Sequence, residues 1–95
     1  MKIGDVVVST AGHDMGELFV VQETLGEYVF LIDGKNRPFE KPKKKKMKHL
    51  AKIGLVEKEK IDEILSNKHT VNAEVRKVLK VYKNQIKENV CQKKM

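Results

Sequence analysis

The chain contains few of the residues on which disulfide bonds and base stacking depend. Its 95 residues include one cysteine (Cys91), two tyrosines, three phenylalanines and no tryptophan. A single thiol cannot form an internal disulfide, so the sequence predicts a reducing, cytoplasmic setting. The shortage of aromatic side chains argues against a stacking platform that would read single-stranded nucleic acid by sequence.

Residues that could carry catalysis or hold a metal are also scarce. The three histidines, His13, His49 and His69, do not have zinc-ligand spacing with Cys91. The sequence has no Walker loop and no nucleophile elbow. We therefore expect a protein that is not an enzyme and that has no cofactor and no metal.

Long apolar runs are missing as well. The N-terminal residues MKIGDVVVS lack the apolar segment of a signal peptide. No apolar run approaches the roughly 20 residues of a membrane-spanning helix. The sequence therefore predicts no membrane partner.

Positive charge, by contrast, is abundant and concentrated. Twenty lysines and arginines face 13 acidic residues, which gives a net charge of +7. Residues 35–52 hold nine of the basic residues and one acid, whereas residues 1–34 sum to −5 and residues 53–95 to +4. A local basic patch of this kind is the electrostatic signature of phosphate binding.

Short strands separated by turns are predicted over the first half of the chain. Turn sequences lie between them, among them AGHDMG at residues 11–16 and the Asp33-Gly34 pair. Strands spaced about 10 residues apart are typical of a small closed or partly closed barrel. The strands are expected at residues 3–9, 18–22 and 28–32, with a short fourth at 37–40 and a fifth at 47–53.

The second half of the chain is predicted to be helical, at residues 57–67 and 71–90, where apolar residues recur at helical spacing. The strands are apolar on both faces, so one face would fill the barrel and the helices are the candidate cover for the other. A partner protein is the alternative contact for the apolar stripe of the second helix. The predicted fold class is α+β, with a barrel at residues 1–53, which includes the basic segment 35–52, and a helical extension at residues 54–95.

Residues 4–34 resemble the KOW motif. The likeness rests on the Gly4-Asp5 strand start, on the Gly-x-Asp-x-Gly loop formed by Gly12, Asp14 and Gly16, and on the Leu-x-Asp-Gly turn that ends at Gly34. This pattern is similar to that of the KOW-type ribosomal proteins of the archaeal and eukaryotic large subunit.

The resemblance is closer still to small bacterial KOW-domain RNA-binding proteins, which continue into an arginine and a Pro-Lys-Lys-Lys-Lys run. Arg37, Pro42 and Lys43–Lys46 match that continuation, so the likeness covers about residues 1–50. The chain departs from the broad KOW pattern at Leu18 and Phe19, where many members carry a third glycine. The resemblance implies an SH3-like β-barrel and RNA binding.

Two segments are expected to contact RNA. In the loop, glycines permit close backbone approach to phosphates, and His13 is the expected contact to a base or phosphate. Asp14 is expected to form the turn by bonding to nearby backbone N–H groups. The loop candidates are Gly12, His13 and Gly16.

In the basic segment, Pro38 and Pro42 favour an extended backbone, so that lysines on alternate sides could straddle a phosphate chain. A solvated linker is the competing interpretation. Phe39 is the best candidate for base stacking, although packing against the barrel explains it equally well. The candidate phosphate contacts are Lys35, Arg37, Lys41, Lys43, Lys44, Lys45, Lys46 and Lys48, with His49 as a weaker addition.

The predicted function is binding to structured RNA, foremost ribosomal RNA, by a ribosomal or ribosome-associated factor of the cytoplasm. Lysines act as point charges and recognise the shape and phosphates of folded RNA rather than its bases. The alternative is a protein–protein adaptor in a transcription or translation complex, which would bind a ribosomal or transcription-factor protein through Val75, Leu79 and Ile86.

Overall fold

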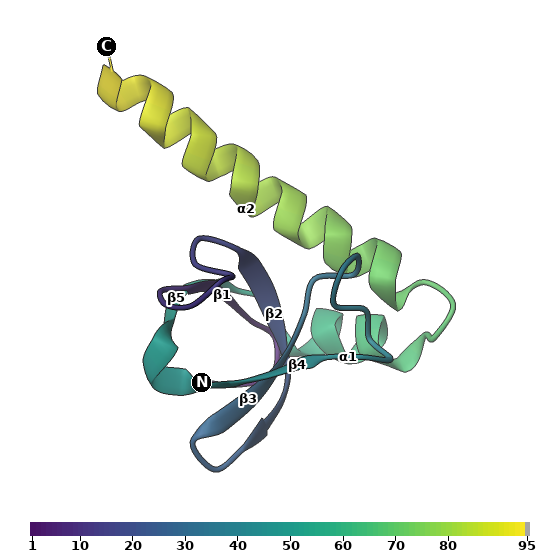
Figure 1. Ribbon diagram of the computed structural model, residues 1–95. Helices are drawn as coiled ribbons and strands as arrows, with labels where there is room; N and C mark the ends of the chain where they lie inside the picture. Colours follow the sequence, from purple (N-terminus) through teal and green to yellow (C-terminus); the bar gives the residue numbers. More distant parts are fainter. Residues whose placement is uncertain (95) are drawn as a thin grey trace.

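The computed structural model describes the backbone of residues 1–94 and the side chains of residues 1–86, so Val90 and Cys91 lie outside the described side chains. A five-stranded antiparallel sheet packs against two helices, which confirms the α+β class (Figure 1). The elements are β1 (Asp5–Ser9), β2 (Leu18–Leu25), β3 (Tyr28–Ile32), β4 (Lys43–Lys46), the 3₁₀ helix η1 (Met47–His49), β5 (Leu50–Leu55), α1 (Lys58–Ser66) and α2 (Val71–Lys94).

The strand order in the sheet is β4-β3-β2-β1-β5, so sequence neighbours pair except where β5 returns to lie beside β1. In Figure 1, α2 runs along one side of the sheet and its C-terminal turns project past the strands. Within residues 1–94, no helix is both long and apolar enough to cross a membrane.

The fourth strand lies in the lysine run and not at residues 37–40, where the sequence prediction was wrong. Strand β4 pairs with β3 from Leu31 opposite Lys43 to Tyr28 opposite Lys46. The preceding residues form turns because proline has no N–H to donate to a ladder and Asp33 closes the segment locally. The Asp33 carboxylate accepts the backbone N–H groups of Lys35 and Arg37, both at 2.8 Å. The interpretation of Lys41–Lys48 as a solvated linker is therefore also wrong at Lys43–Lys46, which form β4.

Two hydrophobic clusters lie on opposite faces of the sheet, because successive side chains of a strand point to opposite sides. The inner cluster consists of Val7, Phe19, Val21, Val29, Leu31 and Leu50. The helix-side cluster joins strand residues to both helices and consists of Val6, Leu18, Val20, Ile32, Ile61, Ile64, Val71, Val75 and Leu79. The chain's own helices thus cover the second face, as the sequence predicted.

Polar contacts also attach α2 to the segment between β3 and β4. The Arg76 guanidinium donates to the Gly34 carbonyl at 2.5 Å, and the Asn72 side-chain oxygen accepts the Phe39 N–H at 2.7 Å. Gly34 has φ +77°, and a Cβ there would overlap the backbone of Asn72. Phe39 itself packs against the helix-side cluster, so packing rather than stacking explains it.

A second close approach, at Gly54, joins α2 to the sheet. The Tyr82 hydroxyl donates to the Leu55 carbonyl at 3.3 Å, and the Tyr82 ring lies where a Gly54 Cβ would stand. Gly54 has no positive φ, so contact with the ring, rather than backbone strain, requires glycine here.

Gly54→Ala is expected to displace the Tyr82 ring and to lower the free energy of unfolding by about 1–3 kcal/mol, the usual effect of overpacking. Urea denaturation measures the change. In a Tyr82→Ala background the same substitution should have a much smaller effect, because the ring is gone. Ala51→Val serves as the control, since Ala51 is an exposed residue of the same strand. An equal loss in both backgrounds would contradict the assignment.

Candidate nucleic-acid interface

Strand alternation divides the four lysines of β4 into two pairs. Lys43 and Lys45 point toward Asp14 of the β1–β2 loop. Lys44 and Lys46 point to the other face, where their ammonium nitrogens lie 4.6 and 5.7 Å from the centre of the Tyr28 ring. The side chains of the lysine run therefore belong to two surfaces with different surroundings.

Asp14, Ser9, Lys43 and Lys45 form a compact polar group, here called the Asp14 cluster. The Lys45 ammonium donates to Asp14 Oδ1 at 2.5 Å, to Ser9 Oγ at 2.7 Å and to the Ala11 carbonyl at 2.7 Å. The Lys43 ammonium lies 2.7 Å from Asp14 Oδ2. Three acceptors use all three N–H donors of Lys45, so this side chain is engaged within its own chain.

The Asp14 carboxylate stays ionised in this setting. Asp14 is 6% exposed, and burial raises its pKa, but hydrogen bonds from Lys43, Lys45 and Ser9 and the charge of Lys43 outweigh that effect. The net result holds the pKa of Asp14 well below its usual range. The expectation that Asp14 bonds to backbone N–H groups is wrong, because its carboxylate binds side chains of β4 and β1.

The Asp14 cluster fixes the loop that carries the other candidates. Gly12 and Gly16 have φ +86° and +89°, in the region that favours glycine. The backbone N–H of Gly16 donates to the Ser9 carbonyl at 2.8 Å, and that of Met15 to the Gly12 carbonyl at 3.2 Å. Asp14 is turned inward, whereas His13 is exposed at the loop surface.

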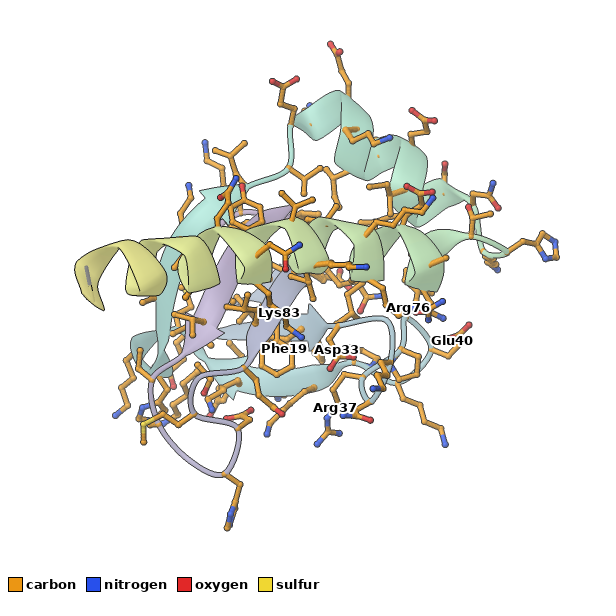
Figure 2. The ribbon with its side chains drawn as sticks, turned by 90° about the horizontal axis from the view of Figure 1, so that it is seen from above. Phe19, Asp33, Arg37, Glu40, Arg76 and Lys83 are labelled. Carbon is orange, nitrogen blue, oxygen red and sulfur yellow. The ribbon has the colours of Figure 1, made fainter. Side chains whose placement is uncertain are left out.

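The remaining predicted contacts lie around this loop and strand. Lys46 approaches Glu27 at 3.8 Å, a surface pair of little energetic weight. His49 is half-buried, and its carbonyl accepts the Thr10 N–H at 2.9 Å, which joins η1 to the loop. Arg37 points outward from the segment between β3 and β4 (Figure 2). The exposed candidates of the basic segment are Lys35, Arg37, Lys41, Lys44 and Lys48.

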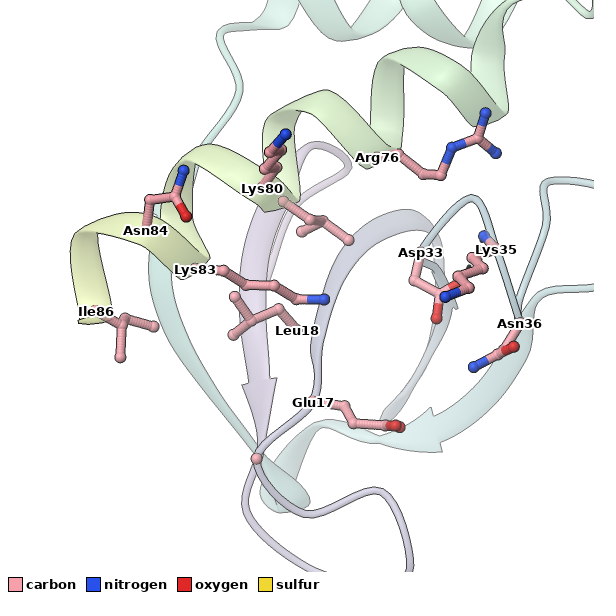
Figure 3. Close-up of a pocket in the computed structure, with 12 residues that line it drawn as sticks. Glu17, Leu18, Asp33, Lys35, Asn36, Arg76, Lys80, Lys83, Asn84 and Ile86 are labelled. Carbon is pink, nitrogen blue, oxygen red and sulfur yellow. Dashed lines mark hydrogen bonds between the residues drawn. The ribbon is translucent and has the colours of Figure 1, made fainter. Parts of the chain in front are cut away.

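A groove of about 650 Å³ lies between α2 on one side and the β1–β2 loop and the segment between β3 and β4 on the other, and the sequence did not predict it (Figure 3). Gly16 and Lys35, which were predicted, line it together with Arg76, Lys80 and Lys83 of α2. The spacing of these α2 residues places them off the apolar stripe, but only the packing of α2 shows that they face the loops. Among the described side chains, no group of three or more histidine, cysteine or acidic residues could hold a metal ion.

No protein-family model matches the chain, and no curated protein is significantly similar to it. The fold and the charge distribution are therefore the basis for inferring a function.

Asp14→Asn should lower the free energy of unfolding at neutral pH by about 3 kcal/mol, because it leaves the ammonium groups of Lys43 and Lys45 without their counter-charge. A carboxylate whose pKa is depressed on folding stabilises the protein above its unfolded pKa of about 4, and this contribution is lost as the pH falls. The difference from the parent protein should therefore shrink in acid, measured by urea denaturation between about pH 7 and pH 2.

Asp62→Asn, at an exposed position of α1, is the matched control and should change stability little at any pH. If the difference in free energy of unfolding between the Asp14→Asn variant and the parent stayed constant down to acidic pH, the charge of Asp14 would not be the source of its stabilising effect.

Proposed function

We propose that the protein binds structured RNA through a basic surface made by β4, η1, the β1–β2 loop and the segment between β3 and β4. Ribosomal RNA is the partner that the KOW resemblance implies, and the protein would then be a ribosomal or ribosome-associated factor. The observation that carries the proposal is the exposure of four cations in β4, η1 and the segment before β4: Arg37, Lys41, Lys44 and Lys48. None of them pairs with a carboxylate among the described side chains.

The fold supports the proposal in outline. A sheet in which the last strand pairs with the first, with one turn of 3₁₀ helix before that strand, is compatible with the SH3-like barrel that the resemblance implies. The loop that corresponds to the KOW motif lies directly against the lysine strand through the Asp14 cluster. Both predicted RNA-binding segments therefore belong to one region of the molecule.

The Asp14 cluster modifies the proposed contacts. We leave Lys45 out of the proposed contacts because its three N–H donors already have acceptors. Lys43 is paired mainly with Asp14. Since two lysines neutralise Asp14, its carboxylate does not repel an approaching phosphate. A loop that is already fixed also loses less conformational entropy on binding.

The structure weakens the adaptor alternative in the form predicted from the sequence. Val75 and Leu79 are 1% and 2% exposed and pack against the sheet, so they are not available to a partner protein. Ile86 remains 43% exposed, and Val81 is 55% exposed. Within the part of α2 whose side chains are described, residues 71–86, these two partly exposed side chains do not make an extended docking surface.

The double variant Lys44→Glu/Lys48→Glu should weaken binding to ribosomal RNA fragments by about tenfold or more, because two phosphate contacts are replaced by repulsion. The slope of log K against log salt should become shallower by about 1.5, as expected for the loss of two contacts. Fluorescence anisotropy across a salt series measures both quantities.

Lys58→Glu/Lys60→Glu is the matched control, since it makes the same charge change at exposed positions of α1. Equal weakening by both double variants would mean that net charge alone controls binding and would refute the proposed surface. Ultraviolet crosslinking in cells, followed by sequencing of the attached RNA, tests the partner. Recovery of one ribosomal RNA segment is the expected result, and recovery of no RNA above background would overturn the function.

A further inference from the structure

The groove beside α2 has two facing walls that come from distant parts of the sequence. Lys80, Lys83 and Asn84 line it from α2, and Lys35 and Asn36 from the segment between β3 and β4. The Lys83 side chain extends from α2 over Leu18 toward the opposite wall (Figure 3). The contacts of Arg76 and Asn72 with that segment hold the two walls together.

The groove is positively charged. Lys35, Lys80 and Lys83 form no ion pair with any other side chain that the structure describes. Asp33 lies at the wall, but its carboxylate already accepts two backbone N–H groups. Glu17 is the remaining acid of the lining, and it is exposed. The lining carries four cations, Lys35, Arg76, Lys80 and Lys83, and two carboxylates, Glu17 and Asp33, and this excess of positive charge favours an anionic ligand.

The rest of the lining suits a planar organic group. Leu18 and Leu79 are 4% and 2% exposed and belong to the helix-side cluster, and Ile86 extends the apolar lining along α2. Asn36 and Asn84 lie on opposite walls, and each amide offers both donors and an acceptor. A groove near 650 Å³ that combines an apolar strip with charged and amide side chains has the size of a site for a small organic molecule.

We propose that this groove holds one unpaired nucleotide of the bound RNA. The phosphate lies between Lys83 and Lys35, and the base lies against Ile86, which is 43% exposed, and the aliphatic stem of Lys83. The amide of Asn36 or Asn84 then donates or accepts hydrogen bonds at the base edge, and the Glu17 carboxylate accepts one. A carboxylate acceptor favours a base with an exocyclic amino group, such as adenine or cytosine, over uracil. This inference rests on the proposed RNA binding and assigns it a second contact, at which the RNA is single-stranded.

The test is a titration of the ¹⁵N-labelled full chain with 5′-AMP, 5′-CMP and 5′-UMP, followed by the amide resonances. We expect AMP and CMP to shift the resonances of Leu18, Asn36, Leu79 and Asn84 at lower concentration than UMP. Lys83→Glu should weaken the AMP response about fivefold or more, as expected for the loss of a charge-assisted phosphate contact. Lys77→Glu makes the same change on α2 outside the groove and should leave the response unchanged.

Inorganic phosphate and a hexaglutamate peptide complete the titration. Shifts from either that equal those from AMP would show a site for any anion or for an acidic peptide, and would overturn the inference. The absence of AMP-induced shifts, or their persistence in Lys83→Glu, would overturn it too. The RNA-binding function is measured separately with the Lys44→Glu/Lys48→Glu variant. If the groove resonances do not respond to nucleotides but salt-dependent RNA binding is intact, only the nucleotide site is rejected. Failure of the parent chain to bind any RNA rejects both.

Discussion

The buried carboxylate of Asp14 is the constraint on which the proposed interface depends. A charge at 6% exposure is tolerated only when it is neutralised, and Lys43 and Lys45 neutralise it from β4. The same pairing fixes the glycine-containing loop against that strand. It also decides which lysines remain free, because strand alternation turns Lys44 away from Asp14 toward the opposite face.

Much of the fold could be predicted because its signals are local. Valine-rich segments between turn residues indicated β1, β2 and β3, and helical spacing indicated α1 and α2 and the face that they bury. Strand β4 was missed because lysine has low strand propensity and four in a row show no alternation of apolar and polar residues. Its formation depends on pairing with the apolar strand β3 and on Asp14, which supplies the counter-charge for two of its lysines.

The candidate site was predicted in part for the same reason. A concentration of charge can be read directly from the sequence, and it indicated the basic segment and the loop. The groove depends instead on how α2 lies on the sheet, which is set by close approaches at Gly34 and Gly54. Gly54 gives no turn signal, since its role is to leave room for Tyr82 of a helix that begins 17 residues later.

The position of β4 at the end of the sheet has a consequence for solubility. Its pairing in the sheet is with β3, so its outer backbone edge faces away from the other strands. An exposed edge is a template for pairing with a strand from another molecule, and natural proteins protect such edges with charged side chains, lysine above all. Lys44 and Lys46, which Asp14 does not engage, thus also discourage edge-to-edge pairing of one copy of the chain with the next. Loss of positive charge from this strand would then promote aggregation even in a protein whose fold is intact.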